Sequence, residues 1–318
     1  MQEKNHFKRF AVQVKNDSLN GILVIDKPVG LSSAKVVATV KQLFQFKKVG
    51  HAGTLDPFAT GVLIVCINQA TKLARFWLSS TKTYLAELCL GIETDTQDST
   101  GNVISTTDAA DIPEHTVRAD ISSFSGTMDQ MPPIYSALKH QGVPLYRLAR
   151  KGIPIQKPAR QIQIYGLDIQ EIALPIVRFK VSCSAGTYVR TMCADMGKAI
   201  GCGGHLKHLR RIASSGFTLA DTVTLTELEE LARAGDIGRH LTGMAAALPD
   251  MASFQADKAL TDKIKYGMMI TTADVPRARL LPGENLVKIL DGNNRLLSIL
   301  IYDPVQDEFG YCCSFATA

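Results

Sequence analysis

The stretch Gly50 to Arg75, GHAGTLDPFATGVLIVCINQATKLAR, contains the features that decide the fold. Its first twelve residues hold three glycines, a proline, a histidine and a single carboxylate, Asp56, and the apolar run 62–67 follows directly. Glycine permits backbone conformations that other residues resist, and Pro57 fixes the chain just after the acid. The pattern predicts a turn that delivers Asp56 to the edge of a buried strand. The alternative is that Asp56-Pro57 is an ordinary turn dipeptide.

The composition bounds the class of protein. A chain of 318 residues can form one large domain and a smaller one, and 46 % apolar with 20 % charged residues excludes a largely disordered chain. Seven cysteines without framework spacing indicate reduced thiols, and no apolar run approaches the ~20 residues of a membrane helix. We therefore expect a cytoplasmic protein with no membrane partner, beginning with a polar leader over residues 1–19.

Hydrophobic periodicity and capping residues predict the remaining elements. Trp77 is expected in the core. The acidic stretch 91–102 (GIETDTQDSTGN) is expected to be a solvated turn, because the sixth residue counted from Asp95 is Thr100 rather than the glycine of a calcium loop, and no glutamate closes it. The expected strands cover 21–26, 62–67, 82–91, 161–172 and 177–182, and the expected helices run from Ser32 or Ser33 to about 46, over 69–77, from Thr187 to about 200, and from Thr224 through 231.

Four motifs resemble the TruB-type branch of the pseudouridine synthases. GHAGTLDPFATGVL followed by ATK resembles the family's catalytic motif, with Phe58 and Asn68 as tolerable departures. The segment 26–33 matches DKPxGxxS, Tyr84 follows at the family's spacing, and GTYVRTMCADMG (186–197) resembles the family's second signature. The resemblance implies that Asp56 is the catalytic nucleophile, that Tyr84 stacks on the target base and handles a proton, and that Arg190 forms an ion pair with Asp56.

The resemblance implies further contacts around this centre. His51 is expected against the target RNA loop, Lys72 near the active site, Tyr188 beside the ion pair and Leu209 in the base pocket. Arg210 and Arg211 are expected to be available to phosphates. Neither cofactor nor metal is implied, and the spacing of Cys202, His205 and His208 does not match the usual structural zinc sites.

Residues 130–167 contain no acid and six basic residues, interrupted by five prolines. Such a segment is suited to following a phosphate backbone, although a charged loop without a partner is the alternative. It overlaps an expected RNA-clamping insertion at about 126–160, and the resemblance implies that this region approaches the T arm of tRNA. Its candidate RNA contacts are Lys139, Arg147, Arg150 and Lys151.

The sequence thus predicts an α+β fold: a pseudouridine synthase catalytic domain on a mixed β-sheet over residues 20–248 and a small β-rich, PUA-like RNA-binding domain over 249–318. The expected activity is isomerisation of uridine 55 to pseudouridine in the T loop of tRNA, by base flipping, in a monomer that requires no protein partner. A non-catalytic tRNA-binding or RNA-folding protein is the alternative. A carboxylate-dependent hydrolase is a weaker one, because no second acid pairs with Asp56 at a motif-like spacing.

Overall fold

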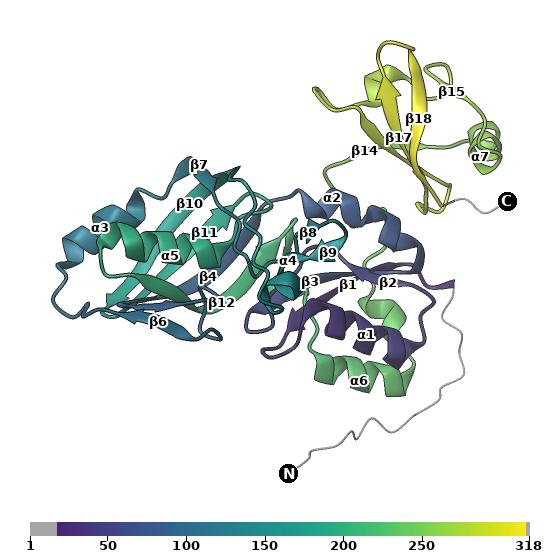
Figure 1. Ribbon diagram of the computed structural model, residues 1–318. Coiled ribbons are helices and arrows are strands. Elements are labelled where there is room, and N and C mark those ends of the chain that lie inside the picture. Colours follow the sequence, from purple (N-terminus) through teal and green to yellow (C-terminus); the bar gives the residue numbers. More distant parts are fainter. Residues whose placement is uncertain (1–17, 316–318) are drawn as a thin grey trace.

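The computed structural model describes residues 18–315, in which a large mixed sheet is followed by a smaller C-terminal sheet (Figure 1). The predicted leader lies almost entirely outside the described residues. The large sheet has the order β1-β3-β12-β4-β11-β10-β7, with β2 paired to β3 and β13 to β12, and only the β3/β12 pairing is parallel. Its strands are β1 (Gly21–Lys27), β2 (Val49–His51), β3 (Thr60–Ile67), β4 (Lys82–Leu90), β7 (Gly126–Gln130), β10 (Arg160–Ala173), β11 (Ile176–Cys183), β12 (Gly204–Ser214) and β13 (Phe217–Thr218).

Helices cover this sheet in two groups (Figure 1). Helices α3 (Glu114–Ser122) and α5 (Val189–Ile200) pack on the half formed by β4, β11 and β10, while α1 (Ser33–Phe44) and α6 (Leu225–Ala234) pack on β1 and β3. The shorter helices are α2 (Ala74–Leu78), α4 (Leu145–Ala149) and the 3-10 turns η2 (Asn68–Leu73), η3 (Leu219–Asp221), η4 (Ile237–His240) and η5 (Arg277–Arg279).

The C-terminal module has its own sheet of order β14-β16-β17-β18-β15 and one helix. Most of its buried apolar residues form a separate core, but Leu290, Leu296 and Ile299 belong instead to a cluster with residues of β1 and β3. These two strands are buried on both faces: alternate side chains of β3 such as Val62 and Ile64 contact the cluster shared with the module, and those between them contact α1 and α6. The elements of the module are β14 (Ala252–Gln255), α7 (Lys258–Lys265), β15 (Ile270–Thr271), β16 (Leu286–Leu290), β17 (Leu296–Asp303) and β18 (Glu308–Ser314).

The predicted α+β architecture is confirmed, with local differences. The helix expected over 69–77 is divided into η2 and α2, and α5 begins at Val189 with Tyr188, not Thr187, as its N-cap. The capping box of α6 is present as predicted: the Thr224 side chain accepts from the backbone N–H of Glu227, and the Glu227 carboxylate accepts from that of Thr224. Trp77 is buried, as predicted.

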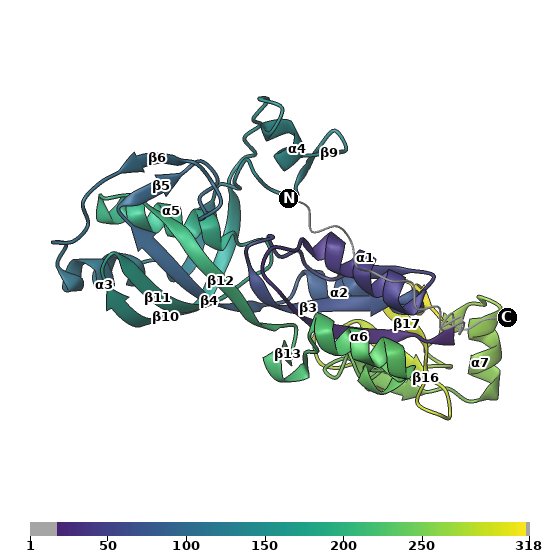
Figure 2. The same cartoon turned by 90° about the horizontal axis from the view of Figure 1, so that it is seen from below.

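Two small hairpins project from the large sheet. The first, β5 (Ile92–Thr94) with β6 (Val103–Thr106), closes the acidic loop 95–102. The second, β8 (Lys139–His140) with β9 (Val143–Pro144), leads into α4 and belongs to the basic segment, which stands away from the sheet (Figure 2). Among the described residues no helix is long and apolar enough to span a membrane.

Candidate active site

Asp56 lies in the turn between β2 and β3, and other parts of the chain bind the backbone of that turn. The Ser33 hydroxyl donates to the Leu55 carbonyl at 3.0 Å and accepts from the Leu55 N–H at 2.8 Å. On the other side of the acid, Lys27 Nζ donates to the Pro57 carbonyl at 3.2 Å. Pairing of buried backbone groups is nearly obligatory, and here the partners come from β1 and α1. The turn is therefore held rigidly while the Asp56 carboxylate remains available to side chains.

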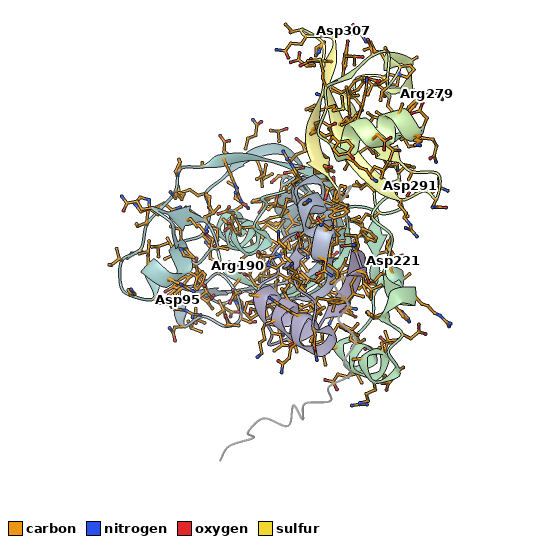
Figure 3. The ribbon with its side chains drawn as sticks, turned by 90° about the vertical axis from the view of Figure 1, so that its right-hand side faces the viewer. Asp95, Arg190, Asp221, Arg279, Asp291 and Asp307 are labelled. Atoms are coloured by element: carbon orange, nitrogen blue, oxygen red, sulfur yellow. The ribbon has the colours of Figure 1, made fainter. Side chains whose placement is uncertain are left out.

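Arg190 provides the main contact of that carboxylate. It lies in the first turn of α5, is 4 % exposed, and its Nε is 2.9 Å from Asp56 Oδ2. Its Nη1 and Nη2 donate to the backbone carbonyls of Thr96 at 2.9 Å and Tyr135 at 2.8 Å. A cation at a helix N-terminus opposes the helix dipole, and these contacts compensate for it. The expected pairing of Arg190 with Asp56 is thus present. Figure 3 labels Arg190, which lies in the larger domain.

A second carboxylate, Asp98, also contacts Arg190, with Oδ2 3.4 Å from Nη1. It is 4 % exposed and accepts hydrogen bonds from the Thr96 hydroxyl and from both the N–H and the hydroxyl of Thr100. The prediction of a solvated turn is therefore wrong at this residue. Threonines two positions away on either side were the only local signal, because hydroxyls that close a loop around an acid allow it to be buried.

A pocket of about 380 Å³ opens beside the ion pair, within the size range of small-ligand sites. Tyr84 on β4 and Leu209 on β12 form part of its wall, and each is 8 % exposed. The lining residues are Gly53, Thr54, Leu55, Asp56, Leu78, Lys82, Tyr84, Ser136, Ala137, Leu138, Arg160, Ser184, Gly186, Thr187, Tyr188, Val189, Arg190, Leu209 and Arg211.

Burial raises the pKa of the Asp56 carboxyl above its usual value, although the charges of Arg190 and Lys27 act in the opposite direction. The nearby Asp98 adds to the rise. The Asp56 side chain is 37 % exposed, but the surrounding protein still raises the pKa of its carboxyl by more than Arg190 lowers it. Burial also lowers the pKa of Lys27 to about 8 and raises that of the Tyr84 phenol. The charge of Arg190 therefore favours the ionised carboxyl but does not offset the effect of burial on the pKa of Asp56.

The other expected pocket residues divide into two groups. Tyr188 and Leu209 line the pocket, as the resemblance implied. His51 does not line it: it pairs with β3 from β2, and within residues 18–315 its buried Nδ1 has no hydrogen-bond partner. Lys72 lies elsewhere, because its Nζ donates to the carbonyl of Ser314 at 2.7 Å. The position predicted for Lys72 beside the active site is not observed.

The two consecutive arginines of β12 also differ from expectation. Arg210 forms an ion pair with Asp26 at 2.7 Å, and its side chain is 38 % exposed. Arg211 is 1 % exposed, and its guanidinium donates to three backbone carbonyls, those of Gly53, Thr54 and Val62. The prediction that Arg211 is available to phosphates is wrong, because its guanidinium is buried and bonded to the chain.

The basic segment is exposed as a nucleic-acid surface requires. Arg147 and Arg150 lie 6.0 and 5.8 Å from the centre of the Tyr146 ring. In the part of the chain that the structure describes, no carboxylate forms an ion pair with any of the four candidate contacts. These exposed residues are Lys139, Arg147, Arg150 and Lys151.

Comparison with known proteins agrees with this geometry. The profile of the TruB family pseudouridylate synthase (N terminal domain) matches residues 41–189, and that of the tRNA pseudouridylate synthase B C-terminal domain matches residues 190–248. The tRNA pseudouridine synthase B of Geobacter sulfurreducens is 45 % identical over 81 % of this chain and 84 % of its own length. That of Syntrophotalea carbinolica is 42 % identical over 90 % and 93 %.

Solved structures show the same fold. A Cbf5-Nop10-Gar1 complex contains a chain that matches 89 % of this one and 78 % of its own length, with a TM-score of 0.66 at 25 % identity. A chain in an H/ACA RNP bound to a substrate RNA containing 2'-deoxyuridine matches 94 % of this one and 84 % of its own, with a TM-score of 0.68 at 22 % identity.

Proposed function

The chain belongs to the TruB family of pseudouridylate synthases, and we propose that it converts uridine 55 in the T loop of tRNA into pseudouridine, with Asp56 as the nucleophile. The observation that carries this proposal is a carboxylate 2.9 Å from a buried arginine, at a pocket that Tyr84 also lines. The reaction breaks the bond between ribose C1′ and N1 of uracil and joins C1′ to C5. A carboxylate nucleophile suits this exchange, because it can form a covalent adduct and leave again.

The pocket residues supply the remaining requirements of the reaction. Arg190 favours the ionised form of Asp56, which is the form able to attack. A uridine within RNA structure must be turned out of its stack before it can enter the pocket, at a cost of a few kcal/mol. Tyr84 provides an aromatic face for the extruded base, and Leu209 provides an apolar wall. Tyr188, next to Arg190 in the chain, closes the same pocket.

The exposed cations of the basic segment supply phosphate contacts. Binding through phosphates is electrostatic and independent of sequence, so it positions the RNA, whereas the pocket selects the base. We infer that the segment holds the T arm and that the C-terminal module is a PUA-like RNA-binding domain beginning near residue 249. We also infer that the enzyme is cytoplasmic. We infer further that it acts as a monomer without a protein partner, and light scattering with and without tRNA would test this.

Release of tritium from 5-tritiated uridine in unmodified tRNA tests the proposal, because C5 loses its hydrogen only when it becomes bonded to ribose. The native protein is compared with Asp56→Asn, which keeps the shape of the side chain but removes its charge. We expect release by the native protein alone, with tRNA bound equally well by both. Binding without release by either would favour the non-catalytic RNA-folding alternative, and release by Asp56→Asn would remove Asp56 from its role.

A further inference from the structure

Strand β12 places Arg211 between β3, which follows the Asp56 turn, and β4, which carries Tyr84. In the sheet Arg211 pairs with Gly61 of β3 on one side and with Tyr84 of β4 on the other. Residues directly opposite one another on antiparallel strands direct their side chains to the same face. Arg211 and Tyr84 therefore share a face, and both line the pocket.

The guanidinium of Arg211 reaches across β3 to the turn that holds Asp56. Its Nε donates to the Val62 carbonyl at 2.7 Å, its Nη2 to Gly53 at 3.2 Å and its Nη1 to Thr54 at 3.5 Å. Thr54 lies two residues before the carboxylate. Arg211 thus binds backbone carbonyls before Asp56, and Lys27 Nζ binds the Pro57 carbonyl directly after it.

The packing around Arg211 leaves little freedom of movement. Gly61 has φ +101°, and a Cβ atom built there would lie 2.1 Å from the Arg211 carbonyl oxygen. Among residues 18–315 no carboxylate forms an ion pair with Arg211, although its side chain is almost completely buried. A buried cation that only backbone carbonyls bind is costly, so packing alone is a poor explanation for an arginine here.

Tyr84 is the second group that Arg211 faces. The two residues lie opposite one another on β12 and β4, both line the pocket, and the charge of Arg211 lowers the pKa of the Tyr84 phenol against the larger effect of burial. A guanidinium can only donate hydrogen bonds, so the phenol oxygen turns its lone pairs toward Arg211 and its hydrogen toward the pocket, where a bound base would lie.

We propose that Arg211 is a positioning residue, which fixes the Asp56 turn and orients the Tyr84 hydroxyl so that both groups meet the same uridine. The inference rests on the proposed function and deepens it. Arg211 acts through its neighbours and takes no part in bond making. Its loss should therefore slow the reaction at saturating tRNA and leave tRNA affinity unchanged.

Single-turnover tritium release separates these effects. Arg211→Lys keeps the charge but cannot span the same set of carbonyls. Arg178→Lys is the matched control, because Arg178 also lies on a strand of the large sheet but at the surface, where it pairs with Glu87 and Glu171. A displaced catalytic group costs about 100-fold, so we expect that loss in rate for Arg211→Lys and a change within about threefold for Arg178→Lys. The tRNA dissociation constant of both variants should stay within about threefold of the native value.

Combining Arg211→Lys with Tyr84→Phe shows whether the arginine acts through the hydroxyl. The Arg211 substitution should cost less in the Tyr84→Phe background than in the native one, because the hydroxyl that it orients is already gone. Tyr84→Phe alone should lower the rate about tenfold or more at unchanged affinity, and it tests the orientation even if Arg211→Lys fails to fold.

Other outcomes overturn the inference. A rate for Arg211→Lys within about threefold of native, a loss confined to tRNA affinity, or fully additive effects of the two substitutions would each do so. An unchanged rate for Tyr84→Phe would overturn the orientation step. The absence of tritium release from the native protein would instead mean that the proposed function fails, before any variant is compared.

Discussion

Replacing Arg190 by methionine should destabilise the protein as well as inactivate it. The substitution keeps much of the side-chain volume but removes a guanidinium that contacts Asp56, Asp98 and the carbonyls of Thr96 and Tyr135. Removing one partner of a buried ion pair costs about 3–5 kcal/mol, because the remaining charge stays buried without a partner. Asp98, which is 4 % exposed, is the residue left in that position. The loss is a large part of the ~5–15 kcal/mol that stabilises a typical protein.

Guanidinium denaturation followed by circular dichroism measures this loss. Arg178→Met is the matched control, because Arg178 also contacts two carboxylates, Glu87 and Glu171, but lies at the surface, where such pairs contribute little. A free energy of unfolding for Arg190→Met within about 1 kcal/mol of native would refute the reasoning. Normal turnover in the same variant would refute the assignment of Arg190 to the reaction. The resemblance implied only the ion pair with Asp56, but the further contacts of Arg190 with Asp98 and two backbone carbonyls indicate a contribution to stability as well.

Three further results are expected. Because burial raises the pKa of Asp56 and attack needs the ionised form, single-turnover rates should fall with decreasing pH around a midpoint above the ordinary 3.8 of an aspartate, and a midpoint at or below it would contradict this. Gly61→Ala should cost about 3 kcal/mol or more in thermal or denaturant unfolding, whereas Gly238→Ala, with no atom near the added carbon, should cost little. Neutralising the four exposed basic residues should weaken tRNA binding and flatten its salt dependence by about 0.7–0.9 per lost phosphate contact, with a slope equal to the native one as the contrary result. These residues are Lys139, Arg147, Arg150 and Lys151; Lys35 and Lys41 on α1 are the control pair.

The fold could be predicted where the sequence carries a local signal. Alternation, capping residues and apolar runs gave β1, β4, β10, β11 and α6 to within a few residues, because each of these elements buries a periodic face. The division of 68–78 into a 3-10 turn and a short helix was missed. Asn68 has a positive φ there, and its side chain binds the backbone of both Leu19 and Lys48, two segments distant in the chain. Such contacts produce no periodic pattern within the segment, so they could not be predicted from it.

The charges of the site show a second limit of sequence reasoning. The resemblance implied that Arg211 is available to phosphates, but Arg211 is buried and donates to backbone carbonyls, as does Lys82. Neither is available to a phosphate. Asp98 is the opposite case, an acid assigned to solvent that lies buried against Arg190. The partners of Arg211 and Asp98 come from distant parts of the chain, and only the assembled sheet brings each pair together.

The position of the C-terminal module follows from the two-sided burial of β1 and β3. A strand with apolar side chains on both faces needs a cover on both, and the helices α1 and α6 cover only one. The module covers the other through Leu290, Leu296 and Ile299, and Lys72 of the catalytic motif reaches its last strand. Residues 249–318 hold nine acidic and seven basic residues, so the positive charge of the chain lies in the larger domain. The main role of the module is therefore to complete the hydrophobic core that supports β3 and the Asp56 turn. Any contact that it makes with RNA must depend on a local cluster of cations, because its net charge is negative.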